Sequence, residues 1–247
     1  MCGRYTLIAS PQALRALFGY EEQPNFPPRY NIAPTQPVAI VRVVEGQRQF
    51  ALMRWGFLPS WAGDPKKFSL LINARGETVR DKPAYQAAMK RRRCLIPADG
   101  FYEWQVKGGD KRPFYVRARS GTPLAFAGLW ETWTGPNGEE LDTAVIVTTR
   151  ANEMLGAIHE RMPAIVAPEA FDLWLGAADV AAAAALIAPA PGNLLEAREV
   201  STAVNRTAND HPQLIEPIGI VPPSAPNAQV RAPVNHDKKD DRQPSLF

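Results

Sequence analysis

The stretch Cys94-Leu95-Ile96-Pro97-Ala98-Asp99-Gly100-Phe101-Tyr102-Glu103-Trp104 decides the fold expected for this chain. It is the densest run of apolar and aromatic residues in the sequence, and it predicts a strand that carries Glu103 among aromatic neighbours. A carboxylate in such surroundings needs a partner or a chemical task, because burying an unpaired charge is costly. Cys94 is expected to lie in the core rather than to act as a reactive thiol.

Strand and turn patterns continue on both sides of this stretch. Further strands are predicted at residues 38–44, 49–54, 68–72, 113–118, 125–133, 143–149 and 197–201, with hairpin turns at 45–47, 107–110 and 134–138. Helices are predicted between Ser10 and Gly19 and at 83–93, 151–158, 171–176 and 180–187, while residues 29–35 are expected to form an ordered loop. The pattern favours an α+β fold, mostly antiparallel β-sheet with helices packed around it.

Length and composition indicate one large globular domain. The chain has 247 residues, of which 45% are hydrophobic and 21% charged. Residues 1–221 are predicted to form the domain, and residues 222–247, rich in proline and mixed charge, to form a disordered tail. No signal-peptide pattern is present, and the longest apolar tract, at residues 180–190, is too short to cross a bilayer. A cytoplasmic protein without membrane contact is therefore expected.

Charge and cysteine content exclude several functional classes. Two distant cysteines give neither a disulfide framework nor zinc-ligand spacing, and no phosphate-binding Gly loop or paired metal ligands occur. A net charge of +3 is too small to indicate a nucleic-acid binder by itself, so a basic patch must be local. The run Lys90-Arg91-Arg92-Arg93 ends a predicted helix, where a solvated basic end that complements the helix dipole is the simplest interpretation.

The first residues, Met1-Cys2-Gly3-Arg4-Tyr5-Thr6, offer a pair of nucleophiles. Removal of Met1 would leave Cys2 with a free α-amine, whose pKa is about 7.7 to 8.0, and a free thiol, whose pKa is about 8.5. Adjacent amine and thiol form a 1,2-aminothiol, which condenses with an aldehyde to an imine and then closes to a thiazolidine. On this segment alone, the favoured interpretation of Cys2 is a small hydrophobic residue at an irregular terminus.

Seven blocks in sequence order resemble the SRAP (SOS-response-associated peptidase) family. They are Met1-Cys2-Gly3-Arg4-Tyr5, Tyr30-Asn31-Ile32-Ala33-Pro34-Thr35, Arg54-Trp55-Gly56, Asn73-Ala74-Arg75-Gly76-Glu77, Cys94-Leu95-Ile96-Pro97 with Gly100-Phe101-Tyr102-Glu103-Trp104, Ala127-Gly128-Leu129-Trp130, and His159-Glu160-Arg161-Met162-Pro163. Each block is weak alone, but seven in order are very specific. The resemblance runs from residue 1 to about 220 and implies a barrel-like core.

The resemblance implies a protein of the DNA damage response that covalently captures abasic sites in single-stranded DNA through its N-terminal cysteine. It implies four active-site residues, which fall on Cys2, Asn73, Glu103 and His159. The family's peptidase label is attached to removal of its own N-terminal residue. No metal or organic cofactor is needed, a monomer needs no further assumption, and a DNA-bound pool would be nucleoid-associated.

The chemistry of these residue types agrees with that implication. Opening a cyclic abasic sugar requires an acid, for which His159 is suited because its ordinary pKa lies near 6.5. Glu103 can shuttle protons during imine formation and ring closure, and Asn73 can orient the Cys2 backbone and a sugar oxygen without titrating. The same active-site groups also suit imine chemistry of the abasic-lyase type.

DNA contacts are expected from residues close in sequence to the catalytic blocks. Phosphate bonds are assigned to Arg4, Arg75, Arg80, Thr149 and Arg161. Aromatic residues can stack on bases that flank the lesion, with candidates among Trp55, Phe57, Trp61 and Trp104.

Two other classes of function remain open at this stage. One is a thiol peptidase with Cys2 as N-terminal nucleophile, activated by Glu103 and His159, whose substrates include its own N-terminus. The other is a DNA-binding module without catalysis, in which Cys2 is incidental. Arginines beside the active-site blocks argue for DNA over a general protein substrate, and the Asn, Glu and His set argues against a pure binding module.

Overall fold

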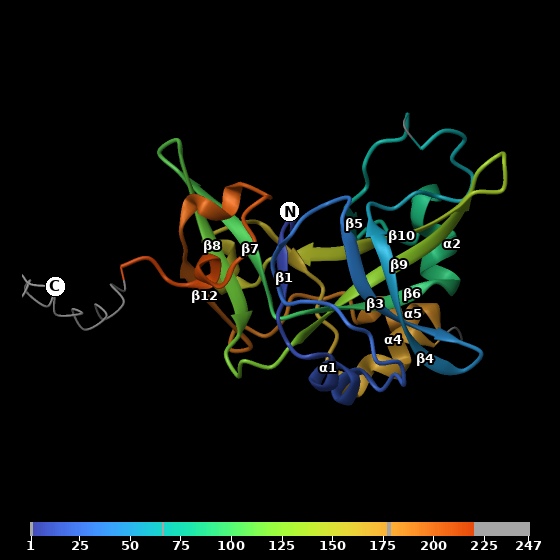
Figure 1. Cartoon of the computed structure of the whole chain (residues 1–247), viewed down its shortest axis with the longest axis horizontal. Helices are drawn as coiled ribbons and strands as arrows, with labels where there is room; N and C mark the ends of the chain where they lie inside the picture. Colours follow the sequence, from blue (N-terminus) through green and yellow to red (C-terminus); the bar gives the residue numbers. More distant parts are fainter. Residues whose placement is uncertain (1, 66, 177–178, 220–247) are drawn as a thin grey trace, which may run out of the picture.

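The computed structural model describes residues 2–65, 67–176 and 179–219, which form two β-sheets with short helices around them (Figure 1). The strands are β1 Tyr5–Leu7, β2 Arg29–Ile32, β3 Pro37–Val44, β4 Gln47–Trp55, β5 Asn73–Arg75, β6 Arg93–Ala98, β7 Gly100–Lys107, β8 Asp110–Ala118, β9 Leu124–Thr134, β10 Glu140–Arg150, β11 Arg161–Pro163 and β12 Leu195–Glu199. The α-helices are α1 Pro11–Phe18, α2 Pro83–Arg91, α3 Glu153–Gly156, α4 Phe171–Leu175 and α5 Val180–Ala185, with 3-10 turns at Pro168–Ala170, Thr202–Asn205 and Pro212–Ile215.

Five strands of the larger sheet close into a ring. The order is β10-β4-β3-β6-β9, and β9 pairs again with β10 from Gly128↔Ile146 to Thr134↔Glu140. β5 and β11 are attached to β10 outside this ring. The pairings are antiparallel except that β4 and β5 run parallel to β10. The predicted α+β fold, mostly antiparallel with a barrel-like core, is confirmed.

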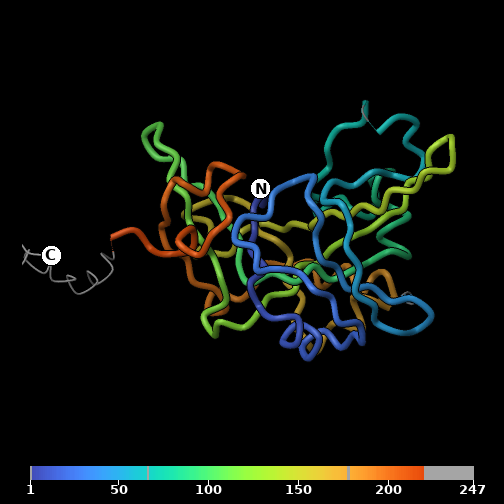
Figure 2. The backbone as a smooth tube through the Cα atoms, in the orientation of Figure 1, coloured from blue at the N-terminus to red at the C-terminus, as the bar shows by residue number. Residues whose placement is uncertain are grey.

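The second sheet has the order β12-β8-β7-β1-β2 and contacts the ring through the first strand of the chain. Figures 1 and 2 show the blue N-terminal segment running between the two halves of the molecule. Tyr5 on β1 contacts Trp55 and Phe126 edge-on, with ring centroids 5.5 and 6.1 Å apart. Phe101 on β7 meets Phe126 at 5.8 Å. These aromatic contacts join both sheets into one core that encloses Cys2.

The predicted turn chemistry is confirmed where local signals were strong. Ser10 caps α1 by accepting a bond from the Ala13 N–H, and Gly19 ends the helix with a φ of 71°. The β3–β4 hairpin turns at Glu45 and Gly46, whose φ values of 51° and 80° suit a two-residue reverse turn. Cys94 has no exposed surface, in agreement with a core role.

Two strand predictions need correction. Residues 29–32 form strand β2, not a loop, because they pair with β1 and because the buried Asn31 amide donates to the carbonyls of Val204, Arg206 and Asn209. Residues 68–72 form no strand beyond a single bridge between Phe57 and Leu71. The strand there is β5, which begins at Asn73, because only residues 73–75 reach β10 for pairing.

The basic run is only partly as predicted, because Lys90 and Arg91 are exposed in the last turn of α2 but Arg93 is not. α2 ends at Arg91, and Arg93 is the first residue of β6 with only 3% of its surface exposed. Its guanidinium donates to the carbonyls of Met89 and Trp174, both at 2.5 Å, and to that of Gly176. Arg93 therefore satisfies carbonyls at two helix ends instead of lying in solvent. Other elements have shifted bounds, among them α3, α5, β8, β10 and β12.

The last predicted segments lie partly outside the described residues. The domain boundary at 221 and the tail at 222–247 fall there, so the domain limits stay a prediction. In the part of the chain that the structure describes, no helix has the length and apolar character needed to traverse a bilayer.

Candidate functional site

Cys2 lies at the junction of the two sheets and has no exposed surface. Its thiol is 3.9 Å from the carbonyl oxygen of Arg4, to which it donates a weak hydrogen bond. Burial, and secondarily the carboxylate of Glu103, raise the pKa of the thiol well above its ordinary value. The sulfur is therefore a neutral thiol at physiological pH, and any reaction at this residue must supply an acceptor for its proton.

Asn73 holds the backbone of Cys2 in place. As the first residue of β5, it sends its side-chain Nδ2 to the Cys2 carbonyl oxygen at 2.9 Å. The hydroxyl of Tyr85 on α2 donates to the Asn73 carbonyl at 3.3 Å, which supports the start of the strand. The Oδ1 atom of Asn73 is buried and accepts no bond from the described residues, so it is available to a hydroxyl or N–H of a ligand.

Glu103 is a buried carboxyl group on β7. Only 1% of its surface is exposed, and burial raises its pKa to about 7. Its electrostatic effect on the Cys2 thiol places it in the same site. A carboxyl group that titrates near neutrality can both donate and accept a proton at physiological pH.

His159 follows α3 and completes the set. Its Nδ1 atom is 4.0 Å from Oε2 of Glu103 and accepts a hydrogen bond from the Arg161 backbone N–H at 3.0 Å. Burial lowers the pKa of the imidazole. The structure thus brings together all four predicted catalytic residues, from β5, β7, the chain start and the α3–β11 loop.

Two of the predicted DNA contacts line a hollow beside this site. Arg4 and Trp104, with Gly3, Pro34, Lys111 and Asn205, surround a volume of about 410 Å³. Arg4 donates to Asn31 Oδ1 at 3.1 Å and to the Val204 carbonyl at 2.9 Å, which fixes its guanidinium at the wall. The Lys111 ammonium lies 5.4 Å from the Trp104 ring centroid. A cationic and aromatic lining suits an anionic chain with stacked bases.

The other four predicted DNA contacts divide into exposed and buried residues. Arg75 and Arg80 are exposed, on β5 and on the turn that follows it. Thr149 and Arg161 are only 6% and 8% exposed. The Arg161 guanidinium binds both carboxylate oxygens of Glu77, at 2.6 and 2.9 Å. Arg161 would have to release Glu77 in order to bind a phosphate in the same bidentate way.

The stacking candidates divide in the same way. Trp55 and Phe57 belong to the core, with 0% and 1% of their surface exposed. Trp61 is 61% exposed and meets Phe68 edge-on at 5.7 Å, so it offers a ring face to solvent. Trp104 is half-buried, with its indole N–H bonded to Asn205 Oδ1 at 2.8 Å. Only Trp61 and Trp104 can stack on a base without unfolding.

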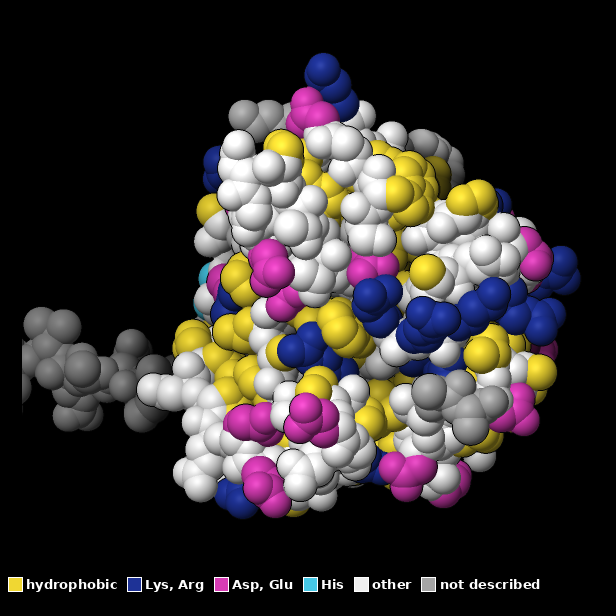
Figure 3. All heavy atoms as spheres, turned by 90° about the vertical axis from the view of Figure 1, so that its right-hand side faces the viewer, with side chains coloured by type: hydrophobic (Ala, Val, Ile, Leu, Met, Phe, Trp, Pro, Cys, Tyr) yellow, Lys and Arg dark blue, Asp and Glu magenta, His cyan; other side chains and the backbone are white. Residues whose placement is uncertain are grey.

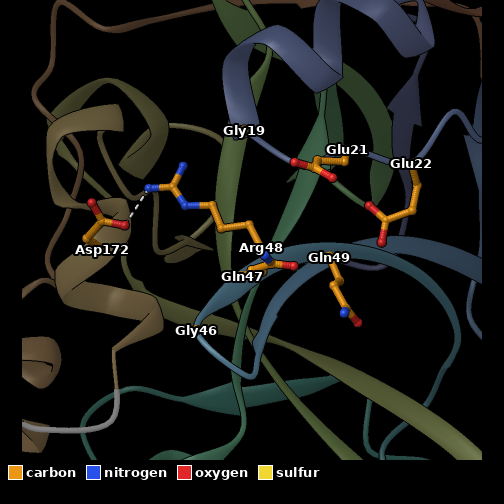
Figure 4. A pocket seen from close by; sticks show the side chains of 8 residues that line it. All are labelled: Gly19, Glu21, Glu22, Gly46, Gln47, Arg48, Gln49 and Asp172. Atoms are coloured by element: carbon orange, nitrogen blue, oxygen red, sulfur yellow. Dashed lines mark hydrogen bonds and ion pairs between the residues drawn. The ribbon is translucent and has the colours of Figure 1, made fainter.

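Other concave and charged surfaces carry no comparable chemistry. The hollow in Figure 4, of about 650 Å³, is lined by Glu21, Glu22, Asp172, Arg48 and neighbours, and its main interaction is the Arg48–Asp172 ion pair at 2.6 Å. Figure 3 shows Lys and Arg side chains in a band across one face. Among the residues placed with certainty, no group of three or more His, Cys, Asp or Glu side chains could hold a metal ion.

The sequence patterns did not predict a role at the site for three nearby residues. Glu77 belongs to a quoted block, but its pairing with Arg161 crosses 84 positions of sequence and has no local signal. Lys111 follows a hairpin turn and gave no pattern of its own. Asn31 was assigned to a loop, although its amide ties β2 to the segment that carries Asn205. A polar residue inside an otherwise apolar block was the only hint available for Asn31.

The fold and the site define a protein class in which a buried cysteine at position 2 is held by an asparagine and flanked by a glutamate and a histidine. The chain belongs to the SOS response associated peptidase (SRAP) family, whose model matches residues 1–207. This confirms the predicted family.

Curated relatives and solved structures agree with this assignment. The chain is 36% identical over 222 residues to abasic site processing protein YoqW of Bacillus subtilis, covering 87% of this chain and 99% of that protein. It is 33% identical over 262 residues to abasic site processing protein HMCES of Gallus gallus, covering 88% and 78%. A crystal structure of a Bacteroides thetaiotaomicron protein shares the fold, with a TM-score of 0.78 at 24% identity and coverage of 87% and 99%.

Proposed function

We propose that this protein captures abasic sites in single-stranded DNA as a covalent thiazolidine on Cys2, after removal of Met1, and so shields the lesion during the DNA damage response. The observation that carries the proposal is the convergence of Cys2, Asn73, Glu103 and His159 in one buried site. The names of YoqW and HMCES as abasic site processing proteins supply the substrate. Residues 1–221 form the domain that does this.

The burial of the thiol sets the order of steps. Because the Cys2 sulfur is protonated, the α-amine attacks the sugar aldehyde first and loses water to form an imine. The sulfur then adds to the imine carbon while the thiol proton passes to the nitrogen, which closes the ring without any net change in protons. Glu103, with a pKa of about 7, accepts and returns that proton.

His159 and Asn73 prepare the aldehyde in this proposal. The closed sugar must open before it can react, and His159 donates a proton to the ring oxygen as the bond breaks. Asn73 holds the Cys2 carbonyl through Nδ2 and offers its unused Oδ1 to a sugar hydroxyl. Holding amine, thiol and aldehyde together is worth about 7 kcal/mol or more when the geometry is good.

The DNA strand lies in the hollow of Arg4 and Trp104 in this proposal. Arg75 and Arg80 bind phosphates from β5 and its turn, and Trp61 and Trp104 stack on bases near the lesion. Thr149 on β10 and Arg161 on β11 are also proposed to contact phosphates, and Arg161 would need to release Glu77 in order to do so. The protein acts as a monomer in the cytoplasm, associated with the nucleoid when bound.

A second activity of the same site is favoured by the family's peptidase description. Cleavage after Met1 would expose the Cys2 amine, and the thiol with Glu103 and His159 forms the nucleophile and base that such a cleavage needs. The relatives YoqW and HMCES are named for the processing of abasic sites. The peptidase activity proposed here is the removal of the protein's own N-terminal residue.

Incubation with a single-stranded oligonucleotide that carries one abasic site, followed by a denaturing gel, tests the proposal. The expected result is a heat-stable band of protein plus DNA, together with an intact mass that lacks Met1. Release of peptide from a protein substrate without a DNA band would instead favour the peptidase. Binding in a native gel without a covalent band would leave a non-catalytic DNA-binding module.

A further inference from the structure

An ion pair between Glu77 and Arg161 crosses the end of β10 next to the catalytic groups. Both Nη atoms of Arg161 donate to the Glu77 carboxylate, at 2.6 and 2.9 Å. Arg161 Nη2 also donates to the carbonyl of Thr148 at 2.8 Å and to its hydroxyl at 3.2 Å. A bidentate pair with a buried guanidinium is among the more geometrically specific contacts in a protein.

This ion pair joins the two segments that carry Asn73 and His159. β5 and β11 flank β10 from opposite sides, with Arg75 opposite Thr148 and Arg161 opposite Arg150. Gly76, between Arg75 and Glu77, donates its N–H to the Thr148 carbonyl at 2.8 Å. A side chain at Gly76 would collide with Ile187, its Cβ only 2.2 Å from Cγ2 of that residue, so this turn packs closely against Ile187.

The backbone of Arg161 determines how His159 holds its proton. The Arg161 N–H can only donate, so its 3.0 Å bond to Nδ1 favours Nδ1 as an acceptor in the neutral imidazole over the longer 3.3 Å contact of Nδ1 with the Arg161 carbonyl. The remaining proton of neutral His159 is then on Nε2. When the ring is protonated, Nδ1 becomes a donor and can turn to the Arg161 carbonyl at 3.3 Å and toward Glu103 at 4.0 Å. The Arg161 backbone thus offers a hydrogen-bond partner to both the neutral and the protonated form of His159.

We propose that the Glu77–Arg161 pair is a positioning unit, which fixes the Arg161 backbone so that neutral His159 carries its proton on Nε2 and the imidazolium formed from it is aligned as the acid for sugar opening. The acid role rests on the proposed function, but the tautomer does not. The charged groups around the imidazole in the described residues are Glu103 on β7 and Glu160 and Arg161 on its own segment. Glu77 acts on His159 only through Arg161.

Glu77→Gln is the direct test, because it keeps shape and removes one charged partner. Glu160→Gln is the matched control: Glu160 is exposed, adjacent to His159 and of equal charge, but takes no part in the pair. Heteronuclear NMR of the DNA-free protein, at a pH where His159 is neutral, reports which ring nitrogen holds the proton. Wild type and Glu160→Gln should show the Nε2–H form, and Glu77→Gln a mixture of both forms.

The rate of crosslinking to the abasic oligonucleotide is the second measurement that tests the positioning role. Glu77→Gln should slow adduct formation roughly tenfold and alter the acidic limb of the pH profile, since general acids typically contribute 10² to 10⁴-fold. Affinity for the oligonucleotide should stay within about twofold. Arg161→Lys, which keeps the charge but not the bidentate guanidinium, should show the same defect in tautomer and rate, and it serves if Glu77→Gln does not fold; its DNA affinity falls as well if Arg161 exchanges Glu77 for a phosphate.

The two readings separate this proposal from the proposed function. An unchanged His159 tautomer and pH profile in Glu77→Gln and Arg161→Lys would overturn the positioning role. Equal defects in Glu77→Gln and Glu160→Gln would overturn it as well, because simple loss of charge would then explain both. Failure of the wild-type protein to crosslink would contradict the proposed function, while the tautomer result would stand on its own.

Discussion

Cys2 carries two reacting atoms in the proposed reaction, the α-amine and the sulfur, and each can be removed separately. Cys2→Ala lacks the thiol proposed to cleave after Met1, so intact mass must first show that Met1 is gone. The processed variant keeps the amine and should form only an imine, which borohydride traps and which heating destroys. A variant that retains a residue before Cys2 keeps the thiol but not the amine, and should form no stable adduct. Denaturing gels with and without borohydride, combined with intact mass, measure both outcomes. A heat-stable adduct from either variant would place the nucleophile on another residue.

Glu103 gives a prediction about stability and pH. Its pKa in the folded protein is raised from 4.5 to about 7 by burial, so the unfolded chain releases this proton at lower pH. The contribution of Glu103 is therefore favourable below pH 4.5 and is lost as the pH rises through 7, by on the order of 3 kcal/mol at most.

Glu103→Gln should consequently melt at a higher temperature than wild type at pH 8, and the difference should shrink toward pH 5. Its rate of adduct formation should fall by about 10² to 10⁴-fold at neutral pH, because proton transfer is lost. Melting curves at pH 5, 6.5 and 8 and single-turnover kinetics check the two parts. A constant melting difference across this range would mean that Glu103 does not titrate as described.

At the scale of elements, Arg93 connects the end of α2 to α4. Arg93 lies almost fully buried on β6. Its guanidinium donates hydrogen bonds to a backbone carbonyl of each helix, at Met89 and Trp174. Arg93→Ala leaves those carbonyls without their partner and should cost about 2 to 4 kcal/mol of unfolding free energy. Arg91→Ala, in the same basic run but exposed, should change it by no more than about 0.5 kcal/mol. Denaturant unfolding compares the two.

At the scale of the whole molecule, the meeting of the two sheets around β1 leaves Cys2 buried, while Arg75 and Arg80 are exposed at the surface. Arg75→Ala should weaken DNA binding and make its dependence on salt shallower, with a slope smaller by about 0.7 for one lost contact to a single strand. Arg15, exposed on α1, is the matched control and should leave the slope unchanged when replaced by Ala. Fluorescence anisotropy over a range of salt concentrations measures both.

The enclosure of Cys2 also predicts which DNA reacts. A sugar can reach a fully buried cysteine only if its strand is unpaired and can bend into the hollow lined by Arg4 and Trp104. Abasic sites in single strands or at single-strand junctions should crosslink, and the same site within a complete duplex should give at most a trace. Equal yields on both substrates would contradict the single-strand restriction.

The sequence by itself determined the features that depend on residue type and local geometry. Ser10, Gly19 and the Glu45-Gly46 turn set their elements through neighbours a few residues away, and the alternation of apolar residues set most strands. The types at Cys2, Asn73, Glu103 and His159, in their sequence blocks, were enough to indicate the family and the chemistry. Their convergence in space was an expectation from the resemblance, not a consequence of spacing.

Only the tertiary structure decided what depends on partners far away in sequence. The exposed fraction of Trp61 against that of Trp55, the burial of Arg93 inside a basic run, and the pairing of Arg161 with Glu77 depend on contacts that no local pattern contains. The same holds for the protonated state of the Cys2 thiol, because desolvation comes from strands that fold around the chain's first residues. Residue types determine which chemistry is possible. The packed surroundings determine the protonation state of the reacting groups and their access to the substrate.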